Sequence, residues 1–138
     1  MLKKIVILTA VHPYKVSGRS ITDLKNLLKD KGHEVVVVTN SYLREELEDV
    51  ISVKSLFSVL KIKVFTKIIS LITKKKRKDS NFYMFDQNSH KIKFDTSIIL
   101  KKIPFKPDAF IYLFQHGFLN EEALYQLNKS TGAPIYRY

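Results

Sequence analysis

The sequence predicts an α/β fold, in which residues 1–138 form a single Rossmann-like domain around a doubly wound, mostly parallel sheet. Three observations support this class. Two apolar runs typical of strands buried on both faces, Ile5–Leu8 and Glu34–Thr39, flank a segment with helical periodicity. A third apolar run, Asp108–Phe114, begins a second strand–helix–strand sequence. The order strand, helix, strand is typical of a parallel βαβ unit.

The first unit has clear boundaries. A helix is expected from about Ser20 to Lys31, with Gly32 in a C-cap role. The apolar residues at spacings of three and four predict its buried face: Ile21, Leu24, Leu27 and Leu28.

The second unit follows a less regular middle, where 81–85 could form a short strand and 87–91 a turn. Asp95 or Thr96 could cap a short helix that ends near Ile103, because Pro104 and Pro107 follow. Asn120 is expected to cap a helix that buries Ala123, Leu124 and Leu127 and ends at 131–132, before a last strand at 133–136. Because that strand runs into the end of the chain, the fold is expected to be truncated.

Composition and charge exclude several classes. The 138 residues include no cysteine, which excludes disulfides, thiolate metal sites and cysteine nucleophiles. Lys and Arg number 24 against 13 Asp and Glu, so the formal charge of +11 points to an anionic partner. The first apolar run is too short for a signal peptide, and no stretch approaches the ~18 apolar residues of a membrane span. A cytoplasmic protein is therefore expected.

Most of this charge lies in one segment, which is expected to form a basic amphipathic helix at about 50–78. Residues 53–78 contain nine basic residues and no acidic one, +9 of the net +11. Six apolar residues recur there at helical spacing: Val53, Phe57, Leu60, Val64, Ile68 and Leu71. The helix could pack on the core with a solvated face. It could instead lie on an anionic membrane at the inner face of the plasma membrane, through Lys74, Lys75, Lys76, Arg77 and Lys78. Nucleic-acid binding is disfavoured, because no aromatic residues interleave with this cluster.

The loop after the first strand is where doubly wound sheets bind ligands. The dinucleotide fingerprint and the P-loop are both absent. Gly18, just before a helix, could let backbone N–H groups approach a phosphate with which Arg19 would pair. Alternatively, Gly18 only lets the chain turn.

The histidines give no metal site, because no two of the four have ligand spacing on one helix. His12 and His116 both follow strands on the ligand side. Either could be a catalytic base or a hydrogen-bonding group for an acceptor, or a solvated loop residue.

The motifs resemble those of family 4 glycosyltransferases. The opening 37 residues from Lys4 include Gly32-His33-Glu34-Val35, which matches the family's G-H-E-V, while Ser17-Gly18 stands where the family has Gly-Gly. Three later stretches, 81–86, 99–114 and 117–138, are similar to a bacterial subgroup with an I-P-x-x-P-D lead-in, a G-F-L loop and a T-G-A-P-I strand. The resemblance covers nearly all of the chain, although the basic segment matches only loosely.

The resemblance implies the N-terminal half of a retaining GT-B fold, whose acceptor binds mostly to this domain. The nucleotide-sugar donor would bind to a missing C-terminal donor domain. The implied substrate-binding residues are His12, Ser17, Gly18, Arg19, Gln115 and Gly117. Gly18 would lie against the donor diphosphate or the reacting sugar, and 115–117 would border the acceptor. His116 is the candidate catalytic residue, in place of a histidine that the family has near position 112 or 113.

These features together predict the acceptor-binding domain of a glycosyltransferase that acts on a polysaccharide or lipid-linked acceptor. This chain would bind no cofactor or metal itself and would not be catalytic alone. The alternatives are a non-catalytic binding module or a subunit completed by a separate donor-domain chain, and a membrane-attached flavodoxin-like domain.

Overall fold

The structure, a computed structural model, describes residues 1–45, 47–54, 60, 63–65, 67–68, 71, 94–113 and 118–138. Its strands are β1 (Lys4–Thr9), β2 (Glu34–Thr39), β3 (Val50–Ser52), β4 (Ala109–Leu113) and β5 (Ile135–Arg137). Its helices are a 3-10 turn, η1 (Val16–Gly18), and the α-helices α1 (Arg19–Asp30), α3 (Ser97–Lys102) and α4 (Glu121–Thr131).

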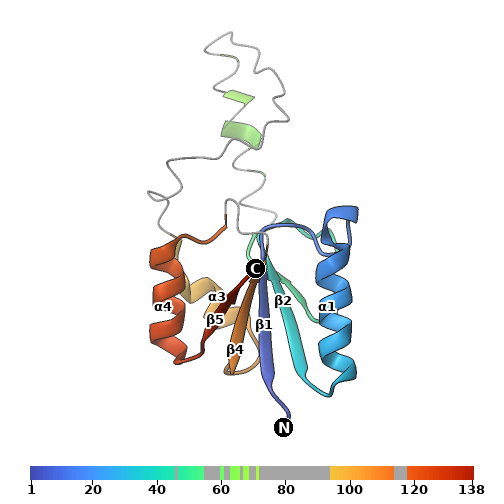
Figure 1. The fold of residues 1–138 in the computed structure, drawn as a ribbon. Helices are drawn as coiled ribbons and strands as arrows, with labels where there is room; N and C mark the ends of the chain where they lie inside the picture. Colours follow the sequence, from blue (N-terminus) through green and yellow to red (C-terminus); the bar gives the residue numbers. More distant parts are fainter. Residues whose placement is uncertain are drawn as a thin grey trace.

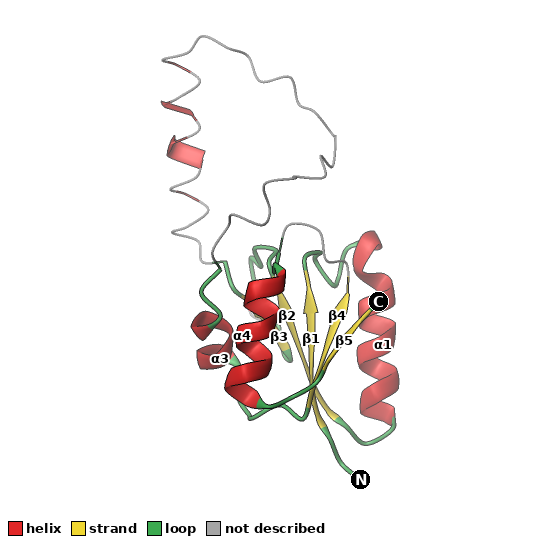
Figure 2. Ribbon diagram, turned by 60° about the vertical axis from the view of Figure 1, so that its left-hand side comes forward, coloured by secondary structure: helices red, strands yellow, loops and turns green. Residues whose placement is uncertain are grey.

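The five strands form one sheet in the order β3-β2-β1-β4-β5, and all pairings are parallel. Val6 of β1, for example, lies between Val36 of β2 and Phe110 of β4. Helix α1 covers one face of the sheet, and α3 and α4 cover the other (Figures 1 and 2). This is the predicted Rossmann-like, doubly wound arrangement.

The central strands are buried on both faces, and their side chains alternate between two clusters. Ile5 and Ile7 of β1 pack on the α1 side with Ile21, Val35 and Val37. Val6 and Leu8 face the other helices, in a cluster that also contains Phe110, Tyr112, Ile99, Leu124 and Leu127. Because both faces are covered, the strands have continuous apolar runs.

Helix α1 agrees with the predicted boundaries but not with the whole predicted buried face. Ile21 is fully buried, whereas Leu27 is 54% exposed, so its assignment to the buried face was wrong. Lys25, one turn after Ile21, lies on that face instead and is only 7% exposed. After the helix, Gly32 has a φ of +83° and donates to the Lys29 carbonyl at 2.8 Å, which confirms its capping role.

The polar residues before α3 and β4 fix where these elements start. The Asp95 carboxylate accepts a hydrogen bond from the Ser97 backbone N–H at 3.0 Å. Hydrogen bonding by the Ser97 side chain, and then by this backbone N–H, lowers the Asp95 pKa. Of the two predicted caps it is therefore Asp95 that bonds, although Thr96 is the residue adjacent to the helix. Asp108 accepts from the Lys4 backbone N–H at 2.7 Å, which joins the starts of β4 and β1.

Helix α4 has the predicted caps and the predicted buried face. The Asn120 side-chain oxygen accepts from the Ala123 N–H at 2.9 Å, and Gly132 ends the helix with a φ of +73°. Ala123, Leu124 and Leu127 are at most 3% exposed.

Replacing Asn120 with alanine should lower the free energy of unfolding by about 1 kcal/mol, because the Ala123 N–H loses its cap. Urea unfolding measures this loss. Asn26→Ala, at an exposed position inside α1, is the matched control and should cost less than about 0.5 kcal/mol. Equal losses for the two variants would contradict the capping role.

The middle of the chain departs from prediction at its start. Residues 50–52 form β3, parallel to β2, so a helix beginning at about 50 was wrong there. The segment is short, and Val50 and Ile51 are β-branched, which favours a strand once β2 offers an edge. The expected strand at 81–85 and turn at 87–91 lie outside the described residues.

Candidate functional site

The candidate site lies at the edge of the sheet where the parallel strands end. From β1, the chain builds the sheet toward β2 and β3 on one side and toward β4 and β5 on the other. The topological switch point is therefore between β1 and β4, and doubly wound sheets bind ligands in the crevice there. The loop of residues 10–18, which follows β1, begins at this edge, and β4 ends there at Leu113.

Hydroxyl groups hold the start of the 10–18 loop against β2. The Thr39 hydroxyl donates to the Val11 carbonyl at 2.8 Å, and the Thr9 hydroxyl accepts from the Val11 N–H at 3.2 Å. Ser41 donates from its hydroxyl to the Ala10 carbonyl at 3.3 Å. Thr9 and Thr39 are both fully buried. The loop is thus fixed before any ligand binds, which lowers the entropic cost of binding.

His12 is half-buried in this loop and one of its ring nitrogens is engaged. Nδ1 accepts a hydrogen bond from the Tyr14 backbone N–H at 3.2 Å. In the neutral ring the proton then lies on Nε2, so Nε2 is a donor. This arrangement suits hydrogen bonding to an oxygen of a ligand better than it suits proton abstraction.

Gly18 is buried against its own loop. A Cβ atom at this position would lie 2.1 Å from the His12 carbonyl oxygen and 2.6 Å from the Pro13 Cα. Its N–H already donates to the Lys15 carbonyl at 2.8 Å. Its φ of −103° is accessible to any residue, so this position needs glycine for close packing, not for a turn.

Ser17 and Arg19 flank Gly18, and both are exposed at the start of α1. The guanidinium of Arg19 and the hydroxyl of Ser17 are suited to phosphate or sugar oxygens. Four predicted site residues, His12, Ser17, Gly18 and Arg19, therefore lie in one short segment at the ligand-binding edge.

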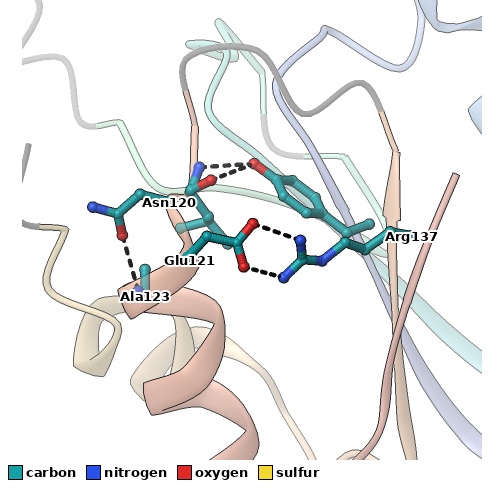
Figure 3. Close-up of polar contacts among 6 residues, drawn as sticks. Asn120, Glu121, Ala123 and Arg137 are labelled. Atoms are coloured by element: carbon teal, nitrogen blue, oxygen red, sulfur yellow. Dashed lines mark hydrogen bonds and ion pairs between the residues drawn. The ribbon is translucent and has the colours of Figure 1, made fainter. Parts of the chain in front are cut away.

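On the other side of the switch point, Tyr112 fixes the connection between β4 and α4. Its buried hydroxyl accepts from the Leu119 N–H at 2.8 Å and donates to the Leu119 carbonyl at 3.0 Å (Figure 3). Burial raises the pKa of this phenol. Just beyond, Arg137 of β5 makes a two-pronged ion pair with Glu121 of α4, at 2.5 and 2.6 Å (Figure 3).

Other predicted site residues lie outside the described residues. They are Gln115, His116 and Gly117 between β4 and α4, and the cluster Lys74, Lys75, Lys76, Arg77 and Lys78.

Two contacts at the edge were missed by sequence reasoning. The bonds of Thr9 and Thr39 were not foreseen, although Thr9 directly follows the first apolar run and Thr39 ends the second. Lys25 was also missed: its Nζ lies 3.2 Å from the Tyr14 hydroxyl and 5.6 Å from the ring centroid. Its position one turn after Ile21 could have indicated that Lys25 lies on the buried face of the helix.

Two further features are absent from the described part of the chain. No three His, Asp or Glu residues there form a group that could hold a metal ion. None of the helices there has both the length and the apolar character needed to cross a membrane.

Comparison with known protein families, curated proteins and solved structures gives no match for this chain. Functional inference therefore depends on the fold, the geometry at the switch point and the sequence motifs.

Proposed function

We propose that this chain is the acceptor-binding, N-terminal domain of a retaining glycosyltransferase. It would serve the transfer of a sugar from a nucleotide-sugar to a polysaccharide or lipid-linked acceptor. One observation carries the proposal: the sheet brings the 10–18 loop and the end of β4 to the same edge, on the two sides of the switch point. The resemblance of the sequence motifs to family 4 glycosyltransferases supports the same function.

The exposed chemistry of the loop fits an acceptor that carries sugar hydroxyls and a phosphate. Nε2 of His12 can donate to a hydroxyl oxygen, Ser17 can donate or accept, and Arg19 can pair with phosphate. Gly18 shapes the loop around these groups through its contact with His12 and Pro13. The nucleotide of the donor would bind to a second domain, so the chain alone would bind acceptor without turnover.

Titration of the ¹⁵N-labelled chain with two probes tests this proposal. A water-soluble, short-chain prenyl diphosphate sugar should shift the amide signals of residues 10–19, whereas a nucleotide-sugar alone should not. Arg19→Ala should weaken binding of the first probe about tenfold or more, the usual loss of one charge-assisted hydrogen bond. Arg44→Ala, which removes the exposed arginine that follows β2, outside residues 10–19, should change the affinity less than twofold.

Three results would contradict the proposal. They are no shift with the prenyl diphosphate sugar at millimolar concentration, equal losses in the two arginine variants, and saturable binding of the nucleotide-sugar at residues 10–19. The last would indicate a self-contained nucleotide-binding module instead.

A further inference from the structure

Four large apolar side chains in the basic segment are exposed, at positions with helical backbone. Leu60 is 49% exposed, Val64 57%, Ile68 48% and Leu71 72%. Spacings of four, four and three are those that bring side chains to one side of a helix, within an arc of about 80°. We call these four residues the exposed stripe. Phe65, beside it, is 66% exposed.

This exposure decides between two of the sequence-based alternatives. A helix that packs on the core would bury its apolar stripe, and the prediction of core packing is wrong for these four residues. Scattered exposed apolar residues are normal on a protein surface, but a row at helical spacing indicates a binding surface.

The sequence around the exposed stripe carries charge of one sign. Lys63 and Lys67 are also exposed, and at about 100° per residue their positions fall beside the stripe. The sequence from 53 to 78 contains no acidic residue. A surface that combines an apolar row with flanking lysines matches an anionic bilayer, where acyl chains meet negatively charged headgroups.

We propose that the exposed stripe, with Lys63 and Lys67, docks this chain on an anionic membrane surface. The stripe enters the boundary between headgroups and acyl chains, while the lysine ammonium groups remain among the headgroup phosphates. This inference goes beyond the proposed function, because docking requires no sugar ligand and would hold for a domain with any other activity.

Lipid is a better match than nucleic acid for this surface. Phosphate-backbone binding would use the lysines but would leave the four apolar side chains in water. Insertion into a bilayer uses both the lysines and the apolar side chains. The two partners therefore differ in whether binding depends on the apolar residues.

Co-sedimentation of the full chain with vesicles tests the proposal. The chain should bind vesicles of 70% phosphatidylcholine and 30% phosphatidylglycerol. A far smaller fraction of it should bind vesicles of pure phosphatidylcholine. The double variant Val64→Ser/Ile68→Ser should weaken partitioning about tenfold or more, from lost apolar burial without a change of charge. Lys63→Gln/Lys67→Gln should weaken it about 25-fold, at roughly fivefold per lysine.

Matched variants on the rest of the surface serve as controls. Lys101→Gln/Lys106→Gln removes the same charge, and Tyr125→Ser/Tyr136→Ser removes exposed apolar surface from α4 and β5. Both should partition within about twofold of the original chain. Because all eight side chains are exposed, circular dichroism should show unchanged folding.

Either of two results would overturn the proposal. The first is equal binding to the anionic and the neutral vesicles. The second is full binding by Val64→Ser/Ile68→Ser together with loss by the lysine variant. If poly(dT) also competed with the vesicles, the second result would indicate a nucleic-acid surface.

Discussion

Replacing Gly18 with alanine should lower the free energy of unfolding by about 3 kcal/mol, the upper part of the usual range for overpacking. The added Cβ would lie 2.1, 2.6 and 2.7 Å from three backbone atoms of His12 and Pro13. A flexible side chain could move away from such a contact, but backbone atoms can do so only if the loop moves.

The loop has little freedom to make that movement. Pro13 is buried, and its carbonyl accepts from the Thr22 hydroxyl of α1 at 2.7 Å. The His12 carbonyl accepts from the Lys15 N–H, and the Lys15 carbonyl from the Gly18 N–H. A shift that accommodates the new Cβ must break some of these bonds, so strain is added to the loss of packing.

The other two described glycines are controls with a different physical cost. Gly32 and Gly132 have φ values of +83° and +73°, and a Cβ atom at either would meet nothing within 4 Å. Alanine at either position should lower the free energy of unfolding only through the strain of the left-handed backbone, by about 1–2 kcal/mol. Urea unfolding of the three variants should rank Gly18→Ala as the most destabilised. A smaller loss at Gly18 than at Gly32 would show that the loop relaxes, and that close packing does not explain this glycine.

The sequence was most informative where local rules and the fold agree. The boundaries of β2, the caps at Gly32, Asn120 and Gly132, and the buried face of α4 were all predicted. Each depends on residues within one element or its ends. An apolar run needs both faces covered, and a helix end needs a cap, whatever the rest of the chain does.

The failures came from contacts that no local sequence pattern encodes. Leu27 has the right spacing for a helical face. Ile21 and Lys25 are the residues that α1 buries, however, and Leu27 is exposed. Residues 50–52 add a strand to the sheet because β2 offers them an edge. Gly18 requires glycine because of His12 and Pro13, a contact that no motif encodes. At the candidate site, sequence reasoning thus found the loop but not the bonds that shape it.

Replacing Tyr112 with phenylalanine should lower the free energy of unfolding by about 2–3 kcal/mol, although the ring is retained. Tyr112 is 1% exposed and Leu119 7%, so the Leu119 N–H and carbonyl lose the hydroxyl in a place that water does not readily reach. Tyr125→Phe is the matched control, because that tyrosine is 58% exposed and its hydroxyl is already in contact with water. Tyr125→Phe should lower the free energy of unfolding by less than about 0.5 kcal/mol.

The same substitution should reveal the raised pKa of Tyr112 in the alkaline range. A phenol is neutral when protonated, so a pKa raised by burial means that the folded state holds this proton more tightly than the unfolded chain does. The resulting stability is complete below the unfolded pKa of about 10 and is lost as the pH rises through the folded pKa. Tyr112→Phe has no such proton, and the raised pKa of Lys29 is present in both proteins. The raised pKa of Arg137 comes chiefly from its hydrogen bond to Glu121, which both proteins keep.

The stability difference between the two proteins should therefore shrink from pH 8 to pH 11, as urea unfolding at each pH would show. A constant difference over this range would mean that the hydroxyl is not coupled to folding through its proton. Burial would then not be what holds this hydroxyl protonated at the β4–α4 connection. Shrinkage in Tyr112→Phe, without any in Tyr125→Phe, would tie the shape of that connection to one buried hydroxyl.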